Sequence, residues 1–151
     1  MPDGSKTTPG VYFALFNEIG IIAQLSRALF EARLPDGLLT PHFSVINHMV
    51  RLGDGKTPLD LARAFQVPKT TMTHSLSILE KHGFVRITKN PDDGRSKCVF
   101  LTDTGRAFRE DAIRLLGPDL AAMASEIDAE DVVSLLPHLE AIRKYLDANR
   151  P

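Results

Sequence analysis

The feature that most constrains the fold is one change of pattern at Gly83. Before it, apolar residues recur at helical spacing. After it come two short β-rich segments, residues 84–88 and 97–101, separated by the turn-forming run Asn90-Pro91-Asp92-Asp93-Gly94. Such a run between two β-rich segments is typical of a hairpin. The sequence therefore predicts a mainly α protein with one small β-hairpin wing.

Several helical segments with clear boundary signals precede this hairpin. Thr40-Pro41 and Thr57-Pro58 each place an N-cap residue before a proline, which suits the first helical turn. Asp60 follows Thr57 at the spacing of a capping box. A further helix is predicted from Pro68 to His82, with Gly83 as its C-cap. Two helices joined by a tight turn and followed by a two-stranded wing form a winged helix-turn-helix.

Long apolar stripes flank this module. A helix of about five turns is expected before residue 34, and Thr102 and Asp128 are expected to cap later helices, the last one kinked by Pro137. We predict a mobile tail at 1–10, a winged helix-turn-helix lobe at 38–102 and dimerisation helices at 11–34 and 103–148. The lobe is too small to cover the flanking stripes, and uncovered stripes mark interfaces.

Composition excludes several classes of protein. A single cysteine, Cys98, excludes an intrachain disulfide framework, and we expect it to be a small buried side chain. The five histidines lack metal-ligand spacing, so neither a metal nor another cofactor is predicted. No catalytic constellation is present either, so we predict no enzyme. Without a signal-peptide pattern, or an apolar run near the roughly 18–20 residues of a bilayer span, we expect a cytoplasmic protein without a membrane partner.

The charge is distributed unevenly along the chain. The net charge is -1, but residues 68–109 carry eight basic and four acidic side chains, a balance of +4. Residues 110–151 carry four basic and nine acidic side chains, a balance of -5. A basic centre is what contact with nucleic-acid phosphates requires.

The helix over 68–82 has two distinct faces. Met72, Leu76 and Leu79 fall in one narrow sector, which is predicted to face the core. The opposite face and its N-terminal flank carry hydroxyl and basic side chains, namely Lys69, Thr70, Thr71, Thr73, His74, Ser77 and Lys81. Such groups donate to phosphate oxygens and to base acceptors in a major groove. A solvated surface is the alternative interpretation of the same face.

The hairpin tip adds two further candidates for DNA binding. Arg95 on a β-tip can enter a narrow minor groove, where negative potential is concentrated. Asp93 precedes it by two residues and can orient its guanidinium. The alternative is an ordinary polar turn with a surface ion pair.

Five stretches together resemble the MarR family of bacterial winged helix-turn-helix transcription regulators. They are residues 39–43, 57–62, 69–74, 79–85, and Asp93-Gly94-Arg95 followed by 101–105, in family order and spacing. The resemblance implies an obligate homodimer on successive major grooves of a palindromic double-stranded DNA operator. It also implies a small, often aromatic or phenolic, effector bound between the dimer helices and the lobe, and His42 and His48 lie near where that pocket would open.

By the same resemblance, Thr70, Thr71, Thr73 and His74 match recognition-helix positions, and Asp93 and Arg95 match the wing. Many relatives have arginine where His74 stands, and histidine carries less charge near neutral pH. We therefore predict a homodimeric, sequence-specific transcription regulator, a repressor released by a small ligand. The alternative is a winged-helix protein-interaction module that does not bind DNA.

Overall fold

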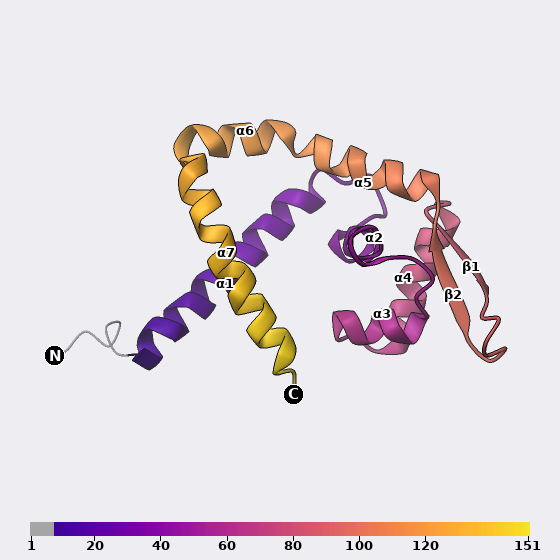
Figure 1. Cartoon of the computed structure of the whole chain (residues 1–151). Coiled ribbons are helices and arrows are strands. Elements are labelled where there is room, and N and C mark those ends of the chain that lie inside the picture. The colour runs from indigo at the N-terminus through magenta and orange to yellow at the C-terminus, as the bar shows by residue number, and fades with distance from the viewer. Residues whose placement is uncertain (1–7) are drawn as a thin grey trace. The chain divides into compact units, whose positions relative to one another are not determined.

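The computed structural model describes residues 8–151, and these residues form a mainly helical chain with one two-stranded hairpin (Figure 1). The predicted fold class is confirmed. In chain order the elements are α1 (Thr8–Glu31), α2 (Thr40–Leu52), α3 (Pro58–Phe65), α4 (Lys69–Lys81), β1 (Val85–Lys89), β2 (Lys97–Leu101), α5 (Asp103–Leu115), α6 (Gly117–Glu126) and α7 (Ala129–Ala148).

The chain divides into two compact units after Leu115. The first holds α1 to α5 with the hairpin, and the second holds α6 and α7. Helix α5 packs on α2 and buries Phe108 and Ala112, so α5 shares the core of the lobe. The division of the chain into a DNA-binding lobe and dimerisation helices stays a prediction.

The core of the lobe is built from one face of each of its helices. Met72, Leu76 and Leu79 of α4 are buried as predicted. They share the core with apolar side chains of α2, α3, β1 and β2, namely Val45, Ile46, Met49, Leu61, Ala62, Val85, Cys98, Val99 and Leu101. Burial of each large side chain contributes about 1.5–3 kcal/mol, so this face fixes how α4 is rotated and leaves its opposite face to solvent.

Two helix starts test the capping predictions. At α3 the capping box is confirmed, because Asp60 N–H donates to Thr57 Oγ1 (3.1 Å) and Thr57 N–H donates to Asp60 Oδ2 (3.3 Å). At α2 the prediction of Thr40 as N-cap is wrong. Leu39 occupies that position, and its N–H donates to Nδ1 of His42 at 2.9 Å. The imidazole of His42 thus takes the place that the carboxylate of Asp60 has in the capping box of α3.

The end of α4 turns the chain directly into the wing. Gly83 has a φ of 75°, its N–H donates to the Glu80 carbonyl (2.9 Å), and Phe84 N–H donates to the Leu79 carbonyl (3.0 Å). These two bonds form a Schellman motif, in which a glycine adopts the left-handed conformation at low cost. The C-terminal glycine predicted from the sequence is confirmed.

The wing is an antiparallel hairpin whose register runs from Val85↔Leu101 to Lys89↔Lys97. A third segment that the sequence analysis missed pairs with its outer edge. Val99 N–H donates to the Lys56 carbonyl (2.8 Å), and Gly55 N–H donates to the Val99 carbonyl (2.9 Å). The segment between α2 and α3 therefore serves as a short extra strand as well as a connection between the two helices.

The start of α5 fits closely against the base of the wing. Thr102 caps the helix as predicted, because Gly105 N–H donates to its Oγ1 at 3.0 Å. The same hydroxyl donates to the Gly83 carbonyl at 2.5 Å. Phe108 of α5 stacks on Phe84 with ring centroids 4.4 Å apart. The lobe, the wing and α5 are thus one packed unit.

The first helix begins earlier than expected. We predicted a tail through residue 10, but α1 starts at Thr8, and Pro9 is compatible with a first helical turn. The rest of the predicted tail, residues 1–7, lies outside the described residues. By length and composition alone, α1 could cross a membrane. The expectation that no segment approaches such a span is corrected, although one helix of this kind is weak evidence for a membrane protein.

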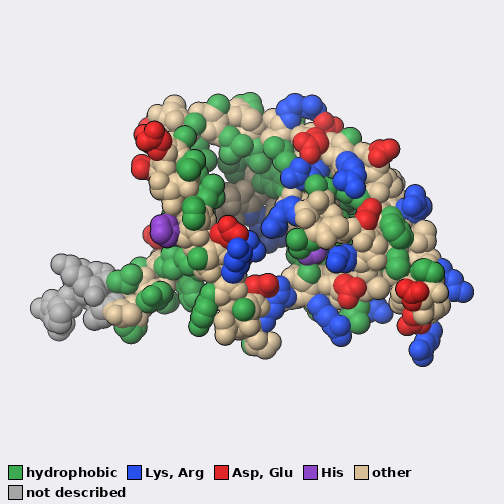
Figure 2. All heavy atoms as spheres, in the orientation of Figure 1, with side chains coloured by type: hydrophobic (Ala, Val, Ile, Leu, Met, Phe, Trp, Pro, Cys, Tyr) green, Lys and Arg blue, Asp and Glu red, His purple; other side chains and the backbone are tan. Residues whose placement is uncertain are grey.

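Helices α1, α6 and α7 expose many large apolar side chains within their own units (Figure 2). Examples on α1 are Tyr12, Phe16 and Ile22, and examples on α7 are Val133 and Tyr145. Helix α7 runs continuously past Pro137 from Ala129 to Ala148. Helix α5 ends at Leu115 and α6 starts at Gly117, with Pro118 in its first turn.

Candidate nucleic-acid interface

Seven of the nine predicted DNA-binding residues share the solvent-exposed side of α4. They are Lys69, Thr70, Thr71, Thr73, His74, Ser77 and Lys81, and each is exposed. Among the described residues, no side chain caps the N-terminus of this helix. The N–H groups of the first turn are thus open to a phosphate oxygen, which the helix dipole also favours.

The only carboxylate on α4 is held by the wing. Oε2 of Glu80 accepts a hydrogen bond from the backbone N–H of Ile87 in β1 at 3.2 Å. A carboxylate free to approach DNA would repel phosphate, whereas this one is engaged by a donor on a neighbouring element. The outer face of α4 therefore offers hydroxyl, imidazole and ammonium groups.

The remaining two predicted residues lie together at the tip of the wing. Asp93 Oδ1 accepts from the backbone N–H of Arg95 (3.0 Å) and from its Nε (3.4 Å). The Arg95 side chain is 94% exposed. An exposed pair of this kind adds little stability, so its structural effect is to give a mobile side chain a preferred direction.

The turn that carries this pair is itself well hydrogen-bonded. Asn90 N–H donates to the Ser96 carbonyl (3.1 Å), and Asn90 Nδ2 donates to Ser96 Oγ (2.8 Å). Ser96 N–H donates to the Asp93 carbonyl at 3.0 Å. Figure 1 shows this hairpin extending from the end of the lobe that also holds α4. Both groups of predicted residues are thus presented by rigid elements of one unit.

The strands of the wing carry basic side chains that the sequence analysis counted as charge but did not assign to the site. Lys89 and Lys97 are exposed and are paired across the strands, and Arg86 lies over the Phe100 ring at 5.7 Å. Like charges in register repel each other. The signal available in the sequence was the alternation of side chains along each strand. The register then shows that Lys89 and Lys97 lie opposite each other.

Not every basic side chain of residues 68–109 is available to a ligand. Arg109 donates through Nε to Oδ1 of Asn47 in α2 (3.0 Å) and pairs with Glu110 (2.7 Å). Its guanidinium is therefore committed to the packing of α5 on α2. Arg109 is nevertheless one of the eight basic side chains that give residues 68–109 their balance of +4.

His42 is a buried side chain of α2 whose electrostatic neighbours include His74, on the exposed face of α4. Burial is the main cause that lowers its pKa from the ordinary 6.5, and the positive forms of His74 and His82 lower it further, while Glu31 acts in the opposite direction. The neutral imidazole accepts the Leu39 N–H through Nδ1. The ring therefore has a structural role in α2.

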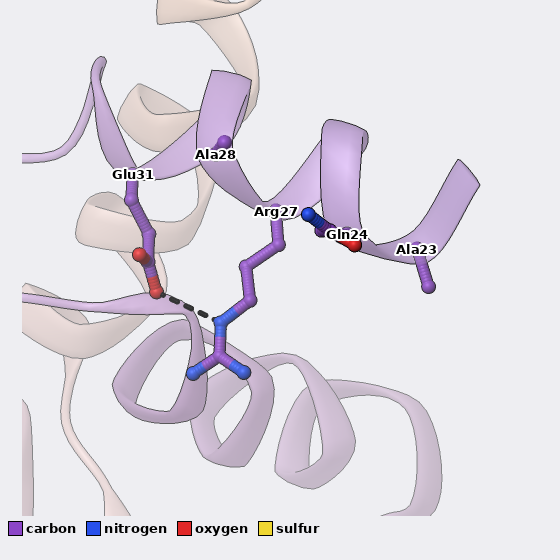
Figure 3. A pocket seen from close by; sticks show the side chains of 5 residues that line it. All are labelled: Ala23, Gln24, Arg27, Ala28 and Glu31. Carbon is purple, nitrogen blue, oxygen red and sulfur yellow. Dashed lines mark hydrogen bonds and ion pairs between the residues drawn. The ribbon is translucent and has the colours of Figure 1, made fainter. Parts of the chain in front are cut away.

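The last turns of α1 border a shallow depression (Figure 3). It is lined by Ala23, Gln24, Arg27, Ala28 and Glu31. Arg27 Nε donates to Glu31 Oε1 at 3.2 Å, and Thr40 N–H donates to the same oxygen at 3.0 Å, which lowers the pKa of Glu31. Within residues 8–151 no group of three or more metal-ligating side chains is present.

The comparisons with known proteins agree with this geometry. The family model described as MarR family matches residues 36–96, which span the lobe from before α2 to the wing tip. Over 140 residues the chain is 26% identical to the transcriptional activatory protein BadR of Rhodopseudomonas palustris, a match that covers 91% of this chain and 77% of BadR.

Two solved structures extend the likeness to the flanking helices. The transcriptional regulator BldR from Sulfolobus solfataricus has a TM-score of 0.77 and 25% identity, and the match covers 92% of this chain and 99% of BldR. A mutant MarR from E. coli, complexed with operator DNA, has a TM-score of 0.69 and 26% identity, with 91% and 99% covered. The lobe, its wing and the matches over nearly the whole length lead to one conclusion: residues 36–96 match the MarR family, and the chain has the winged helix-turn-helix fold of that family's transcription regulators.

Proposed function

We propose that the protein is a homodimeric, sequence-specific DNA-binding transcription regulator. The observation that carries the proposal is the exposed face of α4, whose seven polar and basic residues lie opposite a buried apolar face while its only carboxylate is bound to the wing. Hydrogen-bond donors without a competing acid suit a groove lined by phosphates and base acceptors.

Each predicted residue has a distinct role in this proposal. Thr70, Thr71, Thr73 and His74 lie in the first half of α4 and contact base edges in the major groove. Lys69, Ser77 and Lys81 contact backbone phosphates on either side. Arg95, oriented by Asp93, enters the adjacent minor groove from the wing. The likeness to the E. coli MarR complex with operator DNA supports these roles.

The homodimer is proposed from the apolar faces of the helices outside the lobe. Tyr12, Phe16 and Ile22 of α1 and Val133 and Tyr145 of α7 are exposed in the single chain. A second copy that covers these faces would bring two α4 helices onto one palindromic operator. Glu18, Arg27 and Glu31 also lie on α1, and charged side chains are costly in lipid. We therefore propose a partner chain rather than a membrane as the cover, and a cytoplasmic location.

The direction of regulation and its ligand complete the proposal. The family resemblance favours a repressor that a small aromatic or phenolic molecule releases from its operator. The name of BadR, an activatory protein, favours activation as a second candidate. A reporter gene behind the selected operator separates the two, since loss of the regulator raises expression if it represses and lowers expression if it activates.

The primary test is selection of binding sites from random duplex DNA by the purified protein at stated salt. We expect enrichment of a palindrome and an affinity that falls steeply as salt rises, because phosphate contacts release counterions. Sedimentation without detergent should show a dimer, and Ile22→Asp should weaken it. Absence of any enriched sequence, together with a flat salt dependence, would favour the protein-interaction module instead.

A further inference from the structure

We propose that Glu80 is a positioning residue that fixes the wing relative to α4, so that the contact of Arg95 with DNA depends on it. The inference rests on the proposed DNA-binding function and assigns a role to a residue outside the predicted interface. Glu80 acts through the hydrogen bond that its Oε2 accepts from the Ile87 N–H at 3.2 Å.

The register of the hairpin explains why this N–H needs a side-chain acceptor. Ile87 pairs with Val99, and the backbone groups of Val99 bond outward, to Lys56 and Gly55. In an antiparallel ladder, paired residues whose backbone groups point outward do not bond to each other. The Ile87 N–H therefore faces the open edge of β1, and Glu80 supplies its acceptor from the last turns of α4.

The two edges of the wing are held in different ways. On the β2 edge, Oδ1 of Asp54 accepts the Leu101 N–H at 2.7 Å, in addition to the two backbone bonds of Val99. On the β1 edge, the bond from Ile87 to Glu80 is the one described link from the strand itself to α4. Glu80 thus joins the helix proposed for the major groove directly to the strand that leads to the proposed minor-groove contact.

Glu80 could affect DNA binding as a negative charge or as a hydrogen-bond acceptor, and the two roles predict different affinities for its variants. If Glu80 acted only as a negative charge near DNA, removing the charge would raise affinity, and alanine and glutamine would act alike. If it acts as the acceptor for Ile87, glutamine keeps the wing in place through its amide oxygen, whereas alanine releases it. The conservative variant therefore distinguishes positioning from electrostatics.

The experiment is a set of double-mutant cycles on the full-length protein and its selected operator. Arg95→Ala is introduced into four backgrounds: wild type, Glu80→Gln, Glu80→Ala and Asp111→Ala. The Asp111→Ala background is the control, because it removes an exposed carboxylate on α5 instead. We expect Arg95→Ala to weaken binding about tenfold in the wild-type, Glu80→Gln and Asp111→Ala backgrounds. In the Glu80→Ala background we expect its effect to fall to about twofold or less.

A second measurement needs no DNA. Hydrogen exchange of the Ile87 amide should accelerate in Glu80→Ala and stay near the wild-type rate in Glu80→Gln and Asp111→Ala. The inference is overturned if Arg95→Ala keeps its full effect in Glu80→Ala, or if the Ile87 exchange rate does not change. If wild-type protein binds no duplex DNA, the proposed function fails, whereas the exchange experiment still tests the hydrogen bond.

Discussion

Gly105 at the start of α5 approaches the carbonyl oxygen of Phe84 so closely that a Cβ on Gly105 would overlap this oxygen. The carbonyl also accepts the Thr102 N–H at 3.1 Å, so it is held in place. A side chain at residue 105 would therefore have to displace backbone atoms at the base of the wing. The close contact couples the start of α5 to the position of β1.

The first prediction concerns this contact. Gly105→Ala should lower the free energy of unfolding by about 1–3 kcal/mol, because overpacking forces a backbone shift. Urea denaturation at a fixed protein concentration measures the loss. Gly117→Ala is the matched control, since its added Cβ has no described heavy atom within 4 Å apart from its chain neighbours and the backbone of its own helix. Equal effects of the two variants would contradict the interpretation.

The second prediction concerns the proposed phosphate and minor-groove contacts. Arg95→Ala and Lys81→Ala should each weaken binding to all duplex sequences and reduce the magnitude of the salt slope by about 1. Fluorescence anisotropy over a salt series measures both quantities. Arg143→Ala removes the same charge from α7 and should leave the slope unchanged. An unchanged slope in both interface variants would place the contacts elsewhere.

The third prediction concerns base recognition. Thr71→Val and His74→Ala should change which sequences are selected, because one lost base contact alters discrimination by roughly 1–3 kcal/mol. Repeating the site selection with each variant shows the altered position in the operator. Ser77→Ala, proposed to lose only a phosphate contact, should leave the selected sequence the same. Identical sequence logos for all three variants would show that α4 does not read bases.

The fourth prediction follows from the charge at residue 74. His74→Arg introduces a permanent positive charge on the exposed face of α4. We expect tighter binding to duplex DNA and a salt slope steeper by up to about 1, because the guanidinium adds a phosphate contact. Fluorescence anisotropy over a salt series measures both quantities. Equal affinities and equal salt slopes of the two proteins would contradict this account.

The fifth prediction concerns pH and His42. Its folded-state pKa lies below the ordinary 6.5, with burial as the main cause and His74 and His82 of α4 as further causes, while Glu31 of α1 opposes them. As the pH falls below 6.5, the unfolded chain binds a proton at this residue before the folded chain does. Stability is therefore full above this pH and is lost as the pH falls towards the folded-state pKa.

His42→Asn isolates this contribution, because the amide oxygen can accept the Leu39 N–H in place of Nδ1 and does not titrate. Between pH 8 and pH 5.5, wild type should lose more unfolding free energy than His42→Asn, as measured by urea denaturation. The lowered pKa of His48 has the same sign in both proteins and cancels in the comparison. Parallel pH profiles for the two proteins would exclude His42 as the source.

Local patterns were sufficient for the helices, the wing and the exposed face of α4. The spacing of Met72, Leu76 and Leu79 determines which side of that helix is buried, and Thr57 with Asp60 forms a cap from residues three apart. The buried face of α4 and the cap of α3 depend only on residues close together in sequence, so the geometry of a single helix is enough to predict them.

The features that the sequence did not reveal depend on residues far apart in the chain. Asp54 meets Leu101, Glu80 meets Ile87, and Lys56 pairs with Val99 only after the lobe has folded. The cap of α2 was missed for a different reason, because Leu39 has no side-chain acceptor and a histidine at the third helical residue replaces the usual carboxylate. The roles of the nine predicted DNA-binding residues stay predictions, although all nine are exposed.

The hydrogen bonds described from the wing strands to the rest of the lobe leave from Ile87, Val99 and Leu101, between the middle of the ladder and its base. A strand of five residues such as β1 extends about 16 Å at roughly 3.3 Å per residue. The hairpin is thus a lever, and a rotation of about 5° at the base moves its far end by roughly 1.4 Å, about the margin that separates a hydrogen bond from no contact. Small adjustments of helix packing can therefore be amplified into engagement or release of the guanidinium at the tip.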